Sequence, residues 1–200
     1  MNVVRVVLSA LLVLAGTGGC AVVENRSVTA APPPGSAPAG DSSAPAEDQI
    51  ARAVFDRVNA ERDARGLEPV AWDDALAGVA RDWSAEMADT GEFRHQDIGA
   101  VLQREELSGF RAMGENIFQA TGQVPAGTVH TGWMRSDDHR VNVLNPGWDR
   151  LGIGVFCAAD GSVWATQEFG RTAGADRPAV ASTTPPVEPI ARPDEDGPTC

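Results

Sequence analysis

The chain has 200 residues, a formal net charge of −12 at pH 7 and 42% hydrophobic residues, and its 16 basic residues are all arginine. This length allows one ordinary domain with flanking segments. An acidic chain repels polyanions, so nucleic acid and anionic lipid are excluded as primary partners. The three cysteines, Cys20, Cys157 and Cys200, are too few and too far apart for a disulfide framework or a zinc knuckle.

Residues 1–19 have the pattern of a bacterial export signal. Arg5 supplies the positive charge ahead of an apolar run over residues 6–15, which is too short to span a bilayer as a helix. Small residues then precede Cys20. The segment resembles a lipobox, whose cysteine is lipidated and becomes the mature N-terminus, although Thr17 stands where lipoboxes prefer leucine. We expect an extracytoplasmic lipoprotein anchored to the membrane through Cys20, with a plain secreted protein as the alternative.

The composition divides the rest of the chain into three parts. Residues 20–46 are rich in proline and alanine and predict a disordered tether, whereas residues 47–171 can form a single domain with a core. Residues 172–200 are rich in proline and acidic residues and predict a disordered tail. Cys157 and Cys200 could form a disulfide outside the cytoplasm, but a Cys157 buried in its strand as a small apolar residue would be out of reach. Both alternatives stay open.

Apolar periodicity predicts two long helices at the start of the domain. The first runs from Glu47 towards Gly66, and its apolar stripe consists of Ile50, Val54 and Val58. The second begins after Asp73, a typical N-cap, and continues to about residue 89. We expect Trp83 on its apolar face to be buried against the sheet, and Thr90-Gly91 to end the helix.

Shorter elements follow. They are a short helix within residues 98–112, a short strand or loop at residues 114–118, a helix that begins at Pro125 and carries Trp133, and a helical turn over residues 139–144. Two strands, residues 151–158 and 162–170, flank Asp160-Gly161, a dipeptide typical of hairpin turns. His130 shares the helical face of Trp133, and we expect it to be packed rather than functional.

The motifs along this domain occur in an order that resembles the CAP superfamily (cysteine-rich secretory proteins, antigen 5 and pathogenesis-related 1, with an SCP-like domain) in its bacterial form. They occupy residues 59–62, 65–70, 72–73, 91–95, 114–117, 132–144 and 152–155. The resemblance covers residues 47–171. It implies an α+β fold, a single-domain three-layer α-β-α sandwich with a central sheet between helical layers.

The resemblance also implies a binding cleft formed by His95, Glu115, Ser136 and His139. The family has a second glutamate where this chain has Ser136, and one of the two aspartates that follow could replace it or simply cap the helical turn. Two imidazoles and a carboxylate can hold zinc or another divalent metal, with His95 and His139 as the ligands, and leave an open position. They can equally form hydrogen bonds among themselves, so both interpretations stay open.

Three neighbouring residues have structural interpretations. Asn116 is expected to hold the backbone, and Asn142 to hold its helical turn rigid. Gly114 is expected to let the backbone approach a neighbour closely.

Three functions are compatible with this pattern. The first is a monomeric, membrane-tethered binding module whose cleft holds a metal, a small apolar ligand or a ligand from the cell wall or envelope. The second is a metal-dependent hydrolase of peptide or cell-wall material, with Glu115, His95 and His139 as its catalytic residues. The third is a structural surface protein with a vestigial site. A non-enzymatic role is favoured, because the sequence contains neither a Gly-x-Ser-x-Gly motif nor a cysteine beside a histidine.

Overall fold

The computed structural model describes residues 45–188 and 190–200. Its helices are α1 (Ala46–Asp63), α2 (Asp74–Thr90), α3 (Ile98–Val101), the 3-10 helix η1 (Glu105–Leu107), α4 (Ala126–Arg135) and α5 (Asp137–Val143). Its strands are β1 (Ala71–Trp72), β2 (Phe110–Ala120), β3 (Arg150–Cys157) and β4 (Val163–Thr172). The predicted export signal, the lipidation site Cys20 and nearly all of the predicted tether lie outside the described residues.

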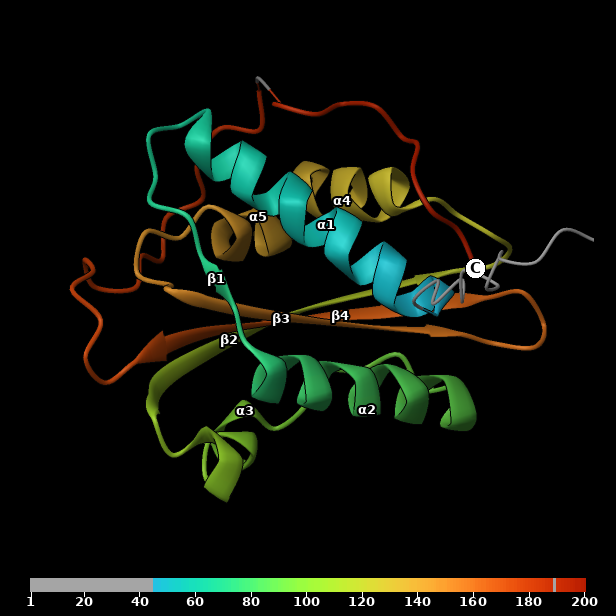
Figure 1. The fold of residues 1–200 in the computed structure, drawn as a ribbon, viewed down its shortest axis with the longest axis horizontal. Helices are drawn as coiled ribbons and strands as arrows, with labels where there is room; N and C mark the ends of the chain where they lie inside the picture. Colours follow the sequence, from blue (N-terminus) through green and yellow to red (C-terminus); the bar gives the residue numbers. More distant parts are fainter. Residues whose placement is uncertain (1–44, 189) are drawn as a thin grey trace, which may run out of the picture. The chain divides into compact units, whose positions relative to one another are not determined.

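The four strands form one sheet in the order β1-β3-β4-β2, in which β1 pairs with β3 in parallel and the other pairs are antiparallel. Helices α1, α4 and α5 cover one face of the sheet, and α2 and α3 lie on the other (Figure 1). The predicted three-layer α-β-α architecture is therefore confirmed. None of the helices in the described part of the chain is both long enough and apolar enough to cross a bilayer.

The two long helices form as predicted. The side chain of Asp73 accepts a hydrogen bond from the Leu76 backbone N–H at the start of α2. Gly91 ends the helix with φ +70°, and its N–H donates to the carbonyl of Met87. This left-handed conformation favours glycine. Trp83 is 7% exposed and packs against the sheet, as expected.

Two glycines of β3 bring α2 close to the sheet. A Cβ atom at Gly152 would overlap the backbone of α2 at Ala77, and one at Gly154 would overlap the backbone at Arg81. Ser84 fixes the same contact, because its hydroxyl donates to the carbonyl of Gly154 at 3.1 Å. This close packing positions the chain that leaves α2 and carries His95.

Strand β2 is longer than the short strand or loop predicted at residues 114–118. It pairs with β4 from Phe110 to Ala120. Helices cover both faces of the sheet, so the strand has no alternation of apolar and polar residues. Its polar side chains also interrupt any apolar run, and the sequence pattern therefore did not predict its full length. The helix predicted within residues 98–112 is split into α3 and η1, and Val101 and Leu107 are buried.

The expectation of a disordered tail is corrected by the structure. Residues 173–188 and 190–200, which we call the strap, run back along the outer side of α1 and α4 (Figure 1). Cys200 forms a disulfide with Cys157, with a Cα–Cα distance of 5.5 Å. Cys157 ends β3 and is only partly buried, so the interpretation as an isolated core residue was wrong.

Ion pairs and backbone bonds hold the strap to the helical layer. The guanidinium of Arg57 in α1 is 2% exposed and contacts the carboxylates of Asp194 and Asp196, each at 2.6 Å. This contact holds the pKa of Asp194 well below its usual range. The N–H groups of Ala126 and Gly127, at the start of α4, donate to strap carbonyls at 3.0 and 2.7 Å. The strap thus satisfies donors that every helix N-terminus leaves unpaired.

Candidate functional site

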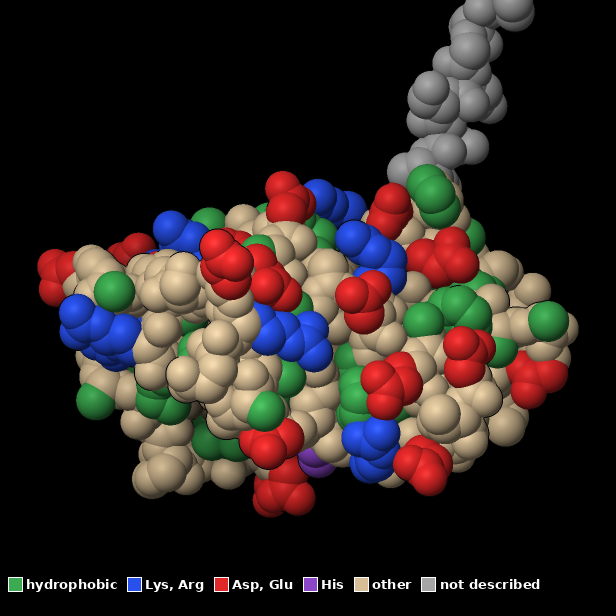
Figure 2. All heavy atoms as spheres, turned by 90° about the horizontal axis from the view of Figure 1, so that it is seen from below, with side chains coloured by type: hydrophobic (Ala, Val, Ile, Leu, Met, Phe, Trp, Pro, Cys, Tyr) green, Lys and Arg blue, Asp and Glu red, His purple; other side chains and the backbone are tan. Residues whose placement is uncertain are grey.

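Glu115 and His95 form a direct pair. His95 Nδ1 lies 2.6 Å from Glu115 Oε1, and the carboxylate side chain is 1% exposed whereas the imidazole is 58% exposed. Figure 2 shows a histidine side chain at the surface among acidic and arginine side chains. Because the buried carboxylate accepts the Nδ1 proton, the lone pair of the ring is left on Nε2. A carboxylate behind an imidazole fixes the orientation of the ring.

Gln96 completes the hydrogen bonds of this carboxylate. Its backbone N–H donates to Glu115 Oε1 at 3.1 Å, and its side-chain Nε2 donates to Oε2 at 2.9 Å. The same Nε2 also donates to Glu168 Oε1 at 2.6 Å. Both oxygens of Glu115 are therefore engaged, and the carboxylate acts on its neighbours rather than on solvent.

Glu168 is a site residue that the sequence analysis missed. It lies opposite Glu115 in the register of β2 and β4 and is 0% exposed. Burial raises the pKa of Glu168 well above its usual range, and the charge of Glu115 raises it further. The raised pKa means that Glu168 holds its proton to a higher pH than an exposed glutamate does. The only available signal was strand register, which places these two carboxyls side by side.

His139 lies in α5 and is half-buried. Burial lowers the pKa of His139, and a charge on His95 lowers it further, against the opposing effect of Asp138. The two imidazoles therefore lie within electrostatic reach of each other, and His139 is neutral at neutral pH. We call His95, Glu115, Glu168 and His139 the polar cluster.

Two asparagines tie α5 to the sheet at this point. Asn116 Nδ2 donates to the carbonyl of His139 at 3.1 Å and to Gln167 Oε1 at 2.9 Å. Asn142 Nδ2 donates to Asn116 Oδ1 at 2.9 Å and to the carbonyl of Glu115 at 3.2 Å. The predicted backbone role of Asn116 is confirmed. The network fixes the backbone of His139 relative to the strand that carries Glu115.

The close approach expected at Gly114 is confirmed. A Cβ atom there would lie 2.9 Å from Trp148 Cζ2 and 3.0 Å from Asn142 Oδ1. A larger residue would displace the asparagine that bridges α5 and β2. Gly114 therefore allows Asn142 to hold α5, which carries His139, against β2, which carries Glu115.

Ser136 and its neighbours serve the junction between α4 and α5. Ser136 has an extended backbone at the start of α5 and makes no side-chain cap. Asp137 pairs with Arg140 one turn later, and its side chain is 78% exposed. Asp137 therefore does not replace the second glutamate of the family. Of the predicted cleft residues, the structure pairs His95 with Glu115 directly.

A metal ion would find few protein ligands here. Within residues 45–188 and 190–200, no group of three or more His, Cys, Asp or Glu side chains is arranged to hold a metal. Glu115 is engaged by His95 and Gln96, so it fits the role of a residue that orients a ligand. The imidazoles of His95 and His139 fit two ligand positions. Water or a bound molecule would have to supply the others, as in open sites.

His130 is packed as expected and stands apart from the polar cluster. It is 0% exposed, and its Nε2 lies 3.5 Å from Glu61 Oε1. Burial lowers the pKa of His130. It is a core residue between α1 and α4.

Known proteins with similar sequences support the resemblance. The protein YkwD of Bacillus subtilis is 36% identical over 122 residues, which are 59% of this chain and 46% of YkwD. The membrane protein YlbC of the same organism is 33% identical over 106 residues, which are 51% of this chain and 30% of YlbC. The matched region thus spans less than half of each relative.

Solved structures agree with the sequence matches. An extracellular protein with an SCP domain from Bacillus anthracis has a TM-score of 0.54 and 33% identity, covering 63% of this chain and 41% of that chain. A cysteine-rich secretory protein from Staphylococcus aureus shares the fold, with a TM-score of 0.51 and 24% identity over 63% of this chain and 40% of that chain. The model of the cysteine-rich secretory protein family (CAP) matches residues 55–169, more than half of the sequence, and the chain therefore belongs to this family.

Proposed function

We propose that the chain is an extracytoplasmic binding module, tethered to the membrane through Cys20, whose polar cluster binds a divalent metal ion and through it a small ligand from the cell envelope. The observation that carries this proposal is the pair formed by exposed His95 and buried Glu115, with Nδ1 and Oε1 2.6 Å apart. This pair leaves Nε2 of the exposed ring as the nitrogen that can ligate an ion. His139, held neutral by burial, supplies the second imidazole.

The open coordination positions favour binding over a structural role for the metal. A structural zinc site uses four protein ligands, whereas two imidazoles leave positions for water or an incoming oxygen donor. The ion would be held weakly and exchange readily. A small ligand with carboxylate or hydroxyl oxygens would complete the shell.

The extracytoplasmic location is supported by the sequence of residues 1–20 and by a relative. The similar protein of Bacillus anthracis is described as extracellular. The lipidation of Cys20 can be tested by labelling with a clickable fatty acid. Label in the wild type that disappears in Cys20→Ala supports the anchor, and an unlabelled wild type means that the protein is secreted free.

Metal binding can be measured as a shift of the melting temperature with zinc. Ligand imidazoles must be neutral, so protons compete with the ion. We expect a shift about one pH unit above the usual histidine pKa of about 6.5, and a smaller one about one unit below it.

The variants identify the residues responsible. The double variant His95→Ala, His139→Ala should lose the shift, and Glu115→Gln should weaken it because the orienting carboxylate loses its charge. Asp89→Asn removes an exposed acid elsewhere and serves as the control for nonspecific binding. If the double variant responds to zinc like the wild type, the polar cluster does not bind the ion.

A further inference from the structure

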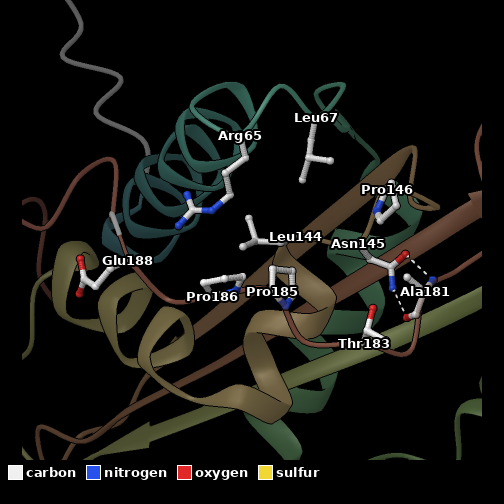
Figure 3. A pocket seen from close by; sticks show the side chains of 10 residues that line it. All are labelled: Arg65, Leu67, Leu144, Asn145, Pro146, Ala181, Thr183, Pro185, Pro186 and Glu188. Carbon is white, nitrogen blue, oxygen red and sulfur yellow. Dashed lines mark hydrogen bonds between the residues drawn. The ribbon is translucent and has the colours of Figure 1, made fainter.

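A pocket of about 500 Å³ lies between the strap and the ends of α1 and α5. Figure 3 shows apolar side chains around it: Leu67, Leu144 and Pro146 come from the domain, and Pro185 and Pro186 come from the strap. The volume is within the range of about 300–1,000 Å³ that is usual for small-ligand sites. The pocket shares no lining residue with the polar cluster, and its strap wall lies outside the segment matched by the family model.

The strap wall of this pocket is fixed before any ligand arrives. Asn145 Nδ2 donates to the carbonyl of Ala181 at 2.7 Å, and the Ala181 N–H donates back to Asn145 Oδ1 at 3.0 Å (Figure 3). Arg140 Nε donates to the carbonyl of Pro185 at 2.8 Å. These bonds hold the strap backbone at two points along the pocket. A preformed wall lowers the ordering cost of binding.

The polar groups at one end of the pocket disfavour an anionic ligand. Arg65 lines that end, but its guanidinium pairs with Glu61 and donates to the carbonyl of Val187 at 3.0 Å. Glu188 adds a negative charge beside it, on a chain with a net charge of −12. The remaining lining is aliphatic, apart from Thr183 and Asn145 at the other end (Figure 3).

We propose that this pocket binds an uncharged molecule with an aliphatic chain. The chain would cover the leucine and proline side chains, whose burial is favourable at about 25 cal/mol per Å² of apolar surface. A neutral polar end, such as a hydroxyl, would meet the Thr183 hydroxyl. The pocket is a second binding site, independent of the metal and ligand proposed for the polar cluster.

The test uses N-phenyl-1-naphthylamine, an uncharged apolar fluorophore that brightens in apolar surroundings. With the oxidised wild-type protein we expect saturable binding and displacement by decanol. Decanoate at about pH 8, where its carboxyl group is ionised, should displace the probe at least about tenfold less effectively. Nonsaturable binding, or equal displacement by the two competitors, overturns the proposal.

Matched variants place the probe in the pocket. Thr183→Trp fills the pocket from an exposed position on the strap and should weaken probe binding at least about tenfold. Ser182→Trp adds the same side chain at the preceding exposed residue, outside the lining, and should bind like the wild type. The double variant His95→Ala, His139→Ala should also bind normally, which separates this site from the polar cluster. Wild-type affinity in Thr183→Trp would show that the probe binds elsewhere.

Discussion

The strap contacts and the polar cluster differ in how completely their buried ionisable side chains are hydrogen-bonded. Arg57, buried beneath the strap, contacts two carboxylates and three backbone carbonyls. Glu168 in the polar cluster is equally buried, yet its Oε2 has no hydrogen-bond partner in the part of the chain that the structure describes. A satisfied buried charge contributes to stability, whereas an unsatisfied carboxyl costs free energy. The comparison indicates that the strap contacts stabilise the fold, whereas the buried carboxyl of Glu168 costs folding free energy.

The largest effect is expected from the disulfide that closes the strap. Cys157 and Cys200 are separated by 43 positions, and removing a cross-link over such a loop costs about 3–4 kcal/mol in the chain-entropy model. The double variant Cys157→Ser, Cys200→Ser should lose this free energy of unfolding in urea. Wild-type protein treated with a dithiol should lose the same amount. An unchanged urea midpoint would show that the strap does not stabilise the domain.

A smaller effect is expected from the arginine beneath the strap. Arg57→Ala should lower the free energy of unfolding by about 2 kcal/mol, because its partners Asp194 and Asp196 are 43% and 76% exposed and water takes over part of the lost bonding. Arg135→Ala is the matched control, since it breaks the exposed ion pair with Glu195 on the same strap and should cost less than about 1 kcal/mol. Equal losses in urea unfolding would contradict the ranking.

In the polar cluster, removing the buried ionisable group should raise stability rather than lower it. The folded state raises the pKa of Glu168, so folding takes up a proton and stability falls as the pH rises above the usual glutamate range. Glu168→Gln has a side chain of the same shape that is neutral at every pH, so it removes this loss. Its melting temperature should exceed that of the wild type at about pH 7 and match it at about pH 4.

The control for this prediction is an exposed glutamate. Glu106→Gln removes the same charge from the surface, so its melting temperature should change between the two pH values by as much as that of the wild type. If Glu168→Gln melts below the wild type at both pH values, the carboxyl makes a stabilising contact that the amide cannot replace, and the contrast with the strap disappears.

The same contrast explains which features could be predicted from the sequence. Asp73, Gly91 and Trp83 act through local capping and helical periodicity, and their roles were confirmed. The polar cluster could be predicted only from the resemblance to the family, which places His95 and Glu115 in one cleft. Glu168 was missed because its neighbour is set by the register of two strands distant in sequence.

The strap was missed for a related physical reason. Its own composition cannot form a core, which is why the sequence predicted disorder. It is ordered by groups outside itself, namely Arg57, the N–H groups that begin α4 and the sulfur of Cys157. The composition of a segment cannot predict partners that lie far away in the sequence.

The smallest effect is expected at Ser136, where the family's second carboxylate is absent. If the metal proposal is correct, Ser136→Glu adds an oxygen ligand to the two imidazoles. It should increase the zinc-dependent stabilisation by about 1 kcal/mol or less, which is measured as a larger rise in melting temperature. Gln103→Glu adds the same charge at another exposed position and controls for general attraction of cations. A larger zinc shift in Ser136→Glu alone would identify the polar cluster as an incomplete metal site. Equal shifts in both variants would leave Ser136 with only its role at the junction of α4 and α5, and the cluster would then differ from the strap in stability alone.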